Sequence, residues 1–253
     1  MPRPRITSAF SWSKFEQSVL DVFTEALNRL ANEPFLSQGE EPINLELYWK
    51  CVEVHREFER AQRSLPFFIW FNPTNQPEPD DTIRSERLLK RPDFACGLTN
   101  PQAADFRKSQ VTYCLECKRL GVAAGKWVFT ENYCEHGMLR FRQTAHSYAK
   151  GASSAAMIGY AQSMPEDDLL TEVNTHAATR TVPSLSRAAL AWVAKGVTAL
   201  SQSPLTRQFD PADIQLRHLW LDLRQMTFIP PPPKPKVLKK KRKKKKKSTA
   251  TKK

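Results

Sequence analysis

Three charged residues, Asp93, Glu116 and Lys118, have the types and the spacing of a hydrolytic site. Glu116 and Lys118 lie two residues apart in segment 111–118 (VTYCLECK), whose β-forming composition predicts a strand. Side chains two residues apart on a strand point to the same face, so these two project together. Asp93 follows Pro92 at the start of a second predicted strand. Antiparallel pairing of the two strands would bring its carboxylate beside them.

Two carboxylates at the end of a sheet provide the oxygen ligands that Mg²⁺ or Mn²⁺ prefers. A lysine beside them can orient a water molecule, help to deprotonate it, or neutralise the charge of a developing phosphorane. A metal ion, a positioned nucleophile and charge stabilisation are what the hydrolysis of a phosphodiester requires. The alternative is an exposed Glu–Lys pair on a sheet face, with Asp93 as a turn residue.

The sequence around these residues, Arg91-Pro92-Asp93-Phe94 and Leu115-Glu116-Cys117-Lys118-Arg119-Leu120, resembles the PD-(D/E)XK nuclease superfamily. The resemblance covers roughly residues 44–165 and implies a restriction-endonuclease-like fold, a mixed sheet with helices on both sides. It also implies that Asp93 and Glu116 bind the divalent metal ion and that Lys118 assists the attacking water.

The superfamily often adds a glutamate from the helix before the first core strand. Glu46 and Glu53 are the candidates on the second predicted helix, and we expect Glu46 to be the further metal ligand. Some members also carry a Gln-x-x-x-Tyr element on the following helix. The nearest match, from Gln143 to Tyr148, is one residue longer than that pattern.

The excess positive charge of the chain is concentrated at its C-terminus. The 253 residues carry a net charge of +13, from 39 basic and 26 acidic residues. Thirteen of the basic residues lie in 234–253, so the remaining 26 balance the 26 acidic ones. This distribution excludes a histone-like chain whose whole folded surface is basic.

Basic residues near the predicted site and in the tail are candidates for phosphate contacts. Beside the site these are Arg119, Arg140 and Arg142, for each of which surface solvation is the alternative. In the tail they are Lys239, Lys240, Lys241, Arg242, Lys243 and Lys244. The tail predicts sequence-independent binding of nucleic acid, with DNA as the expected partner. A nuclear-import signal and a contact with an anionic membrane are the alternatives.

The order of predicted elements indicates an α/β fold with a central mixed sheet flanked by helices. We expect helices over 11–31, 44–60, 131–150 and from 165, a helix-like segment over 184–201, and strands over 65–71, 92–98, 110–120, 155–161 and 214–223. Leu45, Trp49, Val52 and Phe58 form the predicted buried stripe of the second helix. Residues 1–228 are the expected nuclease-like domain, and 229–253 a proline spacer and a disordered polybasic tail.

The cysteines and histidines offer a rival metal site. Cys114, Cys117, Cys134 and His136 could supply four zinc ligands. Cys114 and Cys117 are three residues apart, however, so on one strand they face opposite sides. His146 and His218 are expected to be structural. Five cysteines, an odd number, without an apolar signal core or a membrane span, predict a cytoplasmic protein, or a nuclear one in a eukaryotic host.

These observations together predict a Mg²⁺-dependent endonuclease that cuts DNA. A non-catalytic nucleic-acid-binding or interaction protein with the same fold is the principal alternative. A component of a defence system that needs a partner subunit is also compatible with the motifs, and a homodimer is suggested by analogy with restriction enzymes.

Overall fold

The computed structural model describes residues 12–61, 63, 65, 67–74, 88–99, 109–187 and 196–230. The predicted tail, with Lys239 to Lys244, lies outside these described residues. The strands are β1 (Leu36–Ser37), β2 (Phe68–Phe71), β3 (Phe94–Thr99), β4 (Gln110–Leu120), β5 (Ser154–Ala161), β6 (Ser186–Arg187), β7 (Val197–Ser201), β8 (Leu205–Thr206), β9 (Asp213–Asp222) and β10 (Phe228–Ile229).

A mixed sheet forms the centre of the molecule. Its strand order is β2-β3-β4-β5-β9-β7-β6, and β8 pairs with β9. β3 runs antiparallel to β2 and β4, whereas β4, β5 and β9 run parallel to one another. A separate parallel pair joins β1 to β10. The predicted class, a central mixed sheet flanked by helices, is therefore confirmed.

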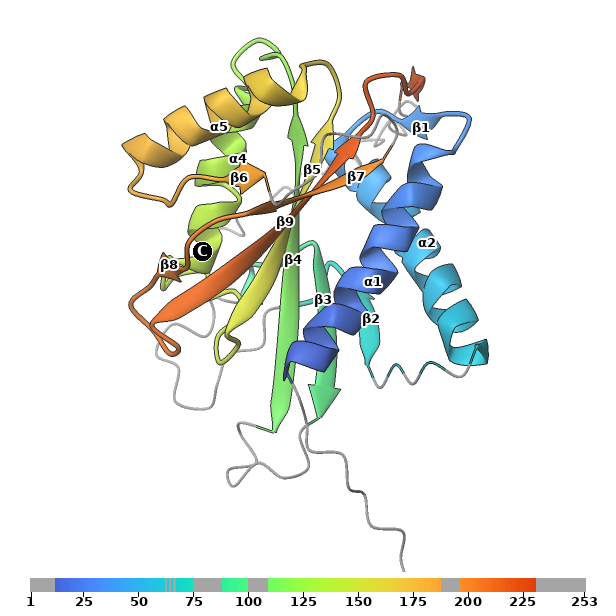
Figure 1. Ribbon diagram of the computed structural model, residues 1–253, viewed down its shortest axis with the longest axis vertical. Helices are drawn as coiled ribbons and strands as arrows, with labels where there is room; N and C mark the ends of the chain where they lie inside the picture. Colours follow the sequence, from blue (N-terminus) through green and yellow to red (C-terminus); the bar gives the residue numbers. More distant parts are fainter. Residues whose placement is uncertain are drawn as a thin grey trace, which may run out of the picture.

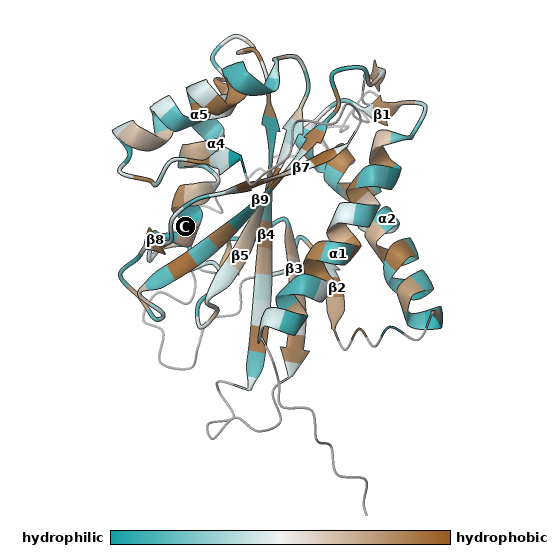
Figure 2. Ribbon diagram, in the orientation of Figure 1, coloured by the Kyte–Doolittle hydropathy of each residue, from teal (hydrophilic) through white to brown (hydrophobic). Residues whose placement is uncertain are grey.

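Helices cover both faces of this sheet (Figure 1). α1 (Trp12–Ala31) and α2 (Glu40–Arg60) pack together on one face, while α4 (Phe129–Glu135), the 3₁₀ helix η2 (Met138–Phe141) and α5 (Glu166–Thr179) lie on the other. The α1 and α2 ribbons alternate between polar and apolar residues, as expected for helices with one buried face (Figure 2). No helix in the described ranges is long and apolar enough to span a membrane.

Two hydrophobic cores lie on opposite sides of the sheet, and β4 contributes to both. Leu115 and Cys117 pack in the core under α1 and α2, whereas Cys114 and Leu120 pack in the core under α4 and α5. This alternation follows from the two-residue repeat of a strand. Cys114 and Cys117 therefore face opposite sides, as their spacing predicts.

Two of the predicted helices are wrong in large part. The helix expected over 131–150 is reduced to α4 and η2, and residues Ser147 and Ala149 have positive φ angles of 48° and 54°. The helix expected over 184–201 is replaced by β6 and β7 at its two ends, and residues 188–195 between them lie outside the described part. β7 pairs with β9, so tertiary pairing overrides the local helical pattern there.

The buried face of α2 also differs from the prediction. Leu45, Trp49 and Val52 are exposed. The helix instead buries the stripe Ile43, Asn44, Leu47, Cys51 and Val54. Both stripes have helical spacing and apolar residues, so periodicity alone could not distinguish them.

Candidate active site

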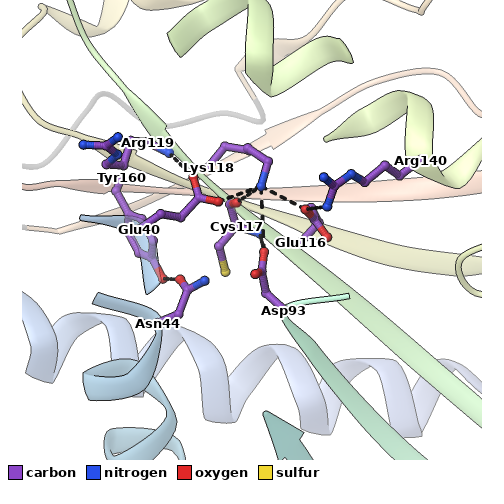
Figure 3. A network of polar contacts seen from close by, with 9 residues as sticks. All are labelled: Glu40, Asn44, Asp93, Glu116, Cys117, Lys118, Arg119, Arg140 and Tyr160. Atoms are coloured by element: carbon purple, nitrogen blue, oxygen red, sulfur yellow. Dashed lines mark hydrogen bonds and ion pairs between the residues drawn. The ribbon is translucent and has the colours of Figure 1, made fainter. Parts of the chain in front are cut away.

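The pairing of β3 with β4 brings the predicted site residues together. Phe94 pairs with Leu115 in this antiparallel ladder, so the residue before β3, Asp93, falls beside Glu116. Lys118 lies two positions further along β4. The side chains of Asp93, Glu116 and Lys118 meet in one polar network, to which α2 and η2 also contribute (Figure 3).

The ammonium group of Lys118 lies at the centre of the network. It donates hydrogen bonds to Glu40 Oε1 at 2.8 Å, to Glu116 Oε1 at 2.9 Å and to the carbonyl oxygen of Cys117 at 2.6 Å. Asp93 Oδ2 lies 4.0 Å from the same nitrogen. Because the lysine side chain is only 9% exposed, these oxygens replace the water that would otherwise solvate it.

Asp93 is fixed by hydrogen bonds to backbone atoms of two neighbouring strands. Its Oδ2 accepts a hydrogen bond of 2.7 Å from the backbone N–H of Cys117. Its carbonyl oxygen accepts one of 2.9 Å from the N–H of Asn72. The carboxylate orientation is therefore set by the sheet itself.

Glu116 is fully buried and carries two cationic partners on one oxygen. Its Oε1 accepts from Lys118 Nζ and, at 2.5 Å, from Arg140 Nη1 of η2. Its Oε2 is also buried, but it has no hydrogen-bond partner among the described residues. A buried carboxylate oxygen in that state is unstable unless a proton or a cation satisfies it.

Burial and mutual repulsion shift the protonation of both carboxyl groups. Burial raises the pKa of Asp93 to about 6, against the lowering effect of Lys118. Burial and the charge of Asp93 raise the pKa of Glu116 to about 8, although Lys118 and Arg140 lower it. Burial lowers the pKa of Lys118, but the surrounding carboxylates outweigh it and hold this pKa above its ordinary value. The lysine therefore stays protonated at neutral pH.

The glutamate that α2 contributes to the network is Glu40. Its carboxylate accepts hydrogen bonds from Lys118 Nζ and, at 3.3 Å, from the backbone N–H of Arg119. Glu46, the predicted ligand, is exposed and is not part of this network. At about 100° per residue, six residues rotate the side chain by about 240° around the helix, so Glu40 and Glu46 point in different directions. The structure therefore places Glu40, and not the expected Glu46, beside Lys118.

A signal for Glu40 was present in the sequence. Gly39 is the N-cap of α2, and Glu40 and Glu41 occupy its first turn together with Pro42. Acidic residues and proline favour the first turn of a helix. The helix begins at Glu40, four residues before the predicted start at residue 44, which leaves Glu40 outside the predicted helix.

The three arginines predicted to contact phosphate lie in different environments. Arg140 is part of the network, as described above. The guanidinium of Arg119 lies 4.7 Å from the centroid of the Phe129 ring. Arg142 Nη1 donates hydrogen bonds to the carbonyl oxygens of Arg180 and Thr181. It therefore caps the C-terminus of α5 and is not part of the network.

The oxygen donors of this network suit a hard divalent cation. Within the described residues, no cluster of three or more His, Cys, Asp or Glu has the arrangement of a metal site, and the carboxylates of this network bond to Lys118. The unpartnered Glu116 Oε2 is nevertheless a ligand atom in a buried, acidic environment. The residues present therefore fit Mg²⁺ or Mn²⁺ in their chemistry.

The rival zinc ligands do not form a cluster. All five cysteines are buried free thiols. Cys114 and Cys117 lie in different cores, and His136 is exposed just after α4. Their environments are those of small hydrophobic core residues.

Comparison with known proteins gives no relative for this chain: no family model, no curated protein and no solved structure matches it.

Proposed function

We propose that this protein is a Mg²⁺-dependent nuclease that hydrolyses phosphodiester bonds in DNA. The observation that carries the proposal is the convergence of Asp93, Glu116 and Lys118, from two antiparallel strands, in one buried network with a carboxylate oxygen left unpartnered. Perturbed, buried titratable groups of this kind are typical of catalytic sites.

The strand arrangement around the network supports the same proposal. β2, β3 and β4 form an antiparallel meander, and β5 returns parallel to β4 after α4 and η2. A mixed sheet with helices on both sides is also what the resemblance to PD-(D/E)XK nucleases implies. The residues of that motif lie on β4 and immediately before β3.

In this proposal Asp93 and Glu116 hold the metal ion, with Glu40 as the further carboxylate. When bound, Mg²⁺ supplies a Lewis acid for the scissile phosphate and a more acidic water. Three carboxylates and the two cations Lys118 and Arg140 leave one net negative charge when all are ionised, which favours a cation.

The protonation of Lys118 defines its role in the reaction. An ammonium group surrounded by carboxylates cannot accept a proton from water, because its pKa is held above its ordinary value. Lys118 instead stabilises the negative charge of the transition state. Its three N–H groups are held by Glu40, Glu116 and the carbonyl oxygen of Cys117, so it would orient the attacking water only after metal binding releases one of these carboxylates. Arg140, which donates to the same oxygen of Glu116 as Lys118, shares this charge stabilisation.

The test is cleavage of plasmid and linear DNA by purified protein with Mg²⁺, Mn²⁺ or a chelator. We expect cleavage with either metal, none with the chelator, and a loss of at least about 100-fold in Asp93→Asn, Glu116→Gln and Lys118→Met. Glu53→Gln, an exposed change on α2, is the matched control and should retain full activity. Cleavage that persists in all three site variants would refute the assignment.

A second candidate is a non-catalytic nucleic-acid-binding protein that acts through its basic tail. The observation that favours it is the concentration of thirteen positive charges in residues 234–253. Replacing the basic residues of 239–247 by glutamine would then abolish binding, whereas the site variants would bind normally. Metal-dependent cleavage by the glutamine-substituted protein would exclude this candidate.

A further inference from the structure

Two aromatic side chains on β2 are exposed. Phe68 is 74% exposed and Trp70 is 46% exposed. The alternate residues Phe67, Ile69 and Phe71 pack against the core under α1 and α2. β2 is therefore apolar on both faces, although it ends the sheet in the described part of the chain. An edge strand does not need apolar residues on its outer face, and they create a risk of aggregation.

The exposed aromatic residues share a sheet face with the candidate active site. Trp70 pairs with Ala95, which in turn pairs with Cys114. Paired residues point to the same face, and Glu116 lies two residues after Cys114 on that face. With about 4.8 Å between strands and 3.4 Å per residue, Trp70 and Glu116 lie about 12 Å apart at Cα. A stacked strand of nucleic acid rises about 3.4 Å per nucleotide, so this distance corresponds to about three to four nucleotides.

Gly97 allows the indole of Trp70 to lie against the sheet. A Cβ atom at Gly97 would be 2.2 Å from Cζ3 and 2.3 Å from Cη2 of the indole. The absent side chain therefore provides the space in which the six-membered ring rests on β3. The ring is supported on one side and remains partly open to solvent on the other.

Positive charges lie beside the same part of the sheet. Lys90 and the exposed Arg91 precede Pro92 and Asp93, and Asn72 at the end of β2 bonds to Asp93. Burial and the charges of Arg140 and Lys90 together lower the pKa of His146 to about 4, so these two cations lie near one imidazole. A polyanion that follows the strand ends would meet cations on its way to Glu116.

We propose that Phe68 and Trp70 form a stacking platform for nucleobases, and that the substrate of the active site is DNA with unpaired bases. This inference rests on the proposed function for the identity of the site. Exposed aromatic rings beside positively charged side chains, here Lys90 and Arg91, are the usual means of holding single strands, because every base has a π-face. In a duplex these faces are covered by neighbouring base pairs.

A second copy of the chain is a less suitable occupant. An aromatic side chain offers about 150–250 Å² when fully exposed, so at 74% and 46% exposure the pair offers roughly 250 Å². A stable protein interface needs about 800 Å² from each partner. Two bases stacked on the rings match the size of this surface more closely.

The experiment measures binding of the full chain, in chelator, to two oligonucleotides of equal length and equal phosphate charge. One is oligothymidine and the other has abasic sugars throughout. We expect the wild type to bind oligothymidine about 10-fold or more tighter than the abasic strand. The double variant Phe68→Leu/Trp70→Leu should lose this preference, because leucine is apolar but has no ring on which a base can stack. Its affinity for the abasic strand should remain that of the wild type. Trp49→Leu, an exposed tryptophan on α2, is the matched control and should keep the preference.

Three results would overturn the inference: no preference for bases in the wild type, a preference that survives in the double leucine variant, or a preference that Trp49→Leu also removes. A shift from dimer to monomer in the double leucine variant, measured by sedimentation, would assign the surface to a second copy and equally refute it. Since binding is measured in chelator, the result is separate from the nuclease proposal, which is tested by Mg²⁺-dependent cleavage and by its loss in the site variants.

Discussion

Replacing Glu116 by glutamine is expected to stabilise the protein at high pH, although it removes a proposed catalytic group. The carboxyl is fully buried, and its pKa is raised from an ordinary value of 4.5 to about 8. Between these two values the folded protein binds a proton that the unfolded chain releases. The stability contributed by this group is therefore present below about pH 4.5 and is lost as the pH rises through about 8.

The size of the effect follows from the pKa difference. Each tenfold change in proton affinity is worth about 1.4 kcal/mol, so the wild type loses at most about 5 kcal/mol across this range. Glutamine has the shape of the protonated side chain and no charge, so Glu116→Gln avoids the loss. The two proteins should have similar stability at about pH 5, and the variant should be more stable by about 3–5 kcal/mol at about pH 9.

Urea unfolding in the presence of a chelator, followed by circular dichroism at several pH values, measures this difference. Added Mg²⁺ should narrow the gap, because a ligand that binds only the folded wild type stabilises it, by about 2.7 kcal/mol at 100 times its Kd. A variant that is equally or less stable than the wild type at pH 9 would refute the reasoning. It would mean that Lys118 and Arg140 compensate the buried carboxylate fully.

Three further predictions concern the same network and the buried His218, which bonds to Tyr133 in the core under α4 and α5. Lys118→Met leaves three carboxylates around an apolar side chain, and it should cost about 3–5 kcal/mol in urea unfolding at neutral pH, with partial recovery when Glu40→Gln is added. Glu40→Gln should reduce Mg²⁺-dependent cleavage by about 10-fold or more, whereas Glu46→Gln on the same helix should leave it unchanged; equal effects of the two would remove Glu40 from the site. Burial lowers the pKa of His218 to about 3, so its neutral form is favoured in the fold and stability should fall as the pH drops from about 6.5 towards 3. His218→Gln should flatten that part of the pH profile relative to the wild type, and parallel profiles would contradict this account.

The strand-borne part of the site could be predicted because it depends on short-range geometry. The two-residue repeat of a strand is enough to place Glu116 and Lys118 on one face. The hairpin-like order of two neighbouring strands is enough to bring Asp93 beside them. The first rule acts over two residues and the second over one pair of consecutive strands, and β4 (Gln110–Leu120) has the limits predicted for it.

The parts contributed by helices were harder to predict because their orientation is set by distant contacts. Two apolar stripes run along α2, and only packing against α1 and the sheet decides which one is buried. That choice also determines whether Glu40 or Glu46 reaches Lys118, 78 residues away in the chain from Glu40. A local helical pattern likewise could not reveal that Val197–Ser201 pairs with β9.

The balance of charge in the network links its stability to its proposed chemistry. Lys118 satisfies one oxygen of Glu116 and one of Glu40, and it thereby allows the buried Glu116 and the partly buried Asp93 and Glu40 to remain close together. It does not satisfy Glu116 Oε2, so one proton or one cation is still required there. The raised pKa of Glu116 means that a proton fills this role at neutral pH. In the proposed function a metal ion would replace that proton. If the proposed Mg²⁺ site is present, protons compete with the metal ion below about pH 8, and the apparent affinity for Mg²⁺, measured by calorimetry at several pH values, should increase up to about that pH.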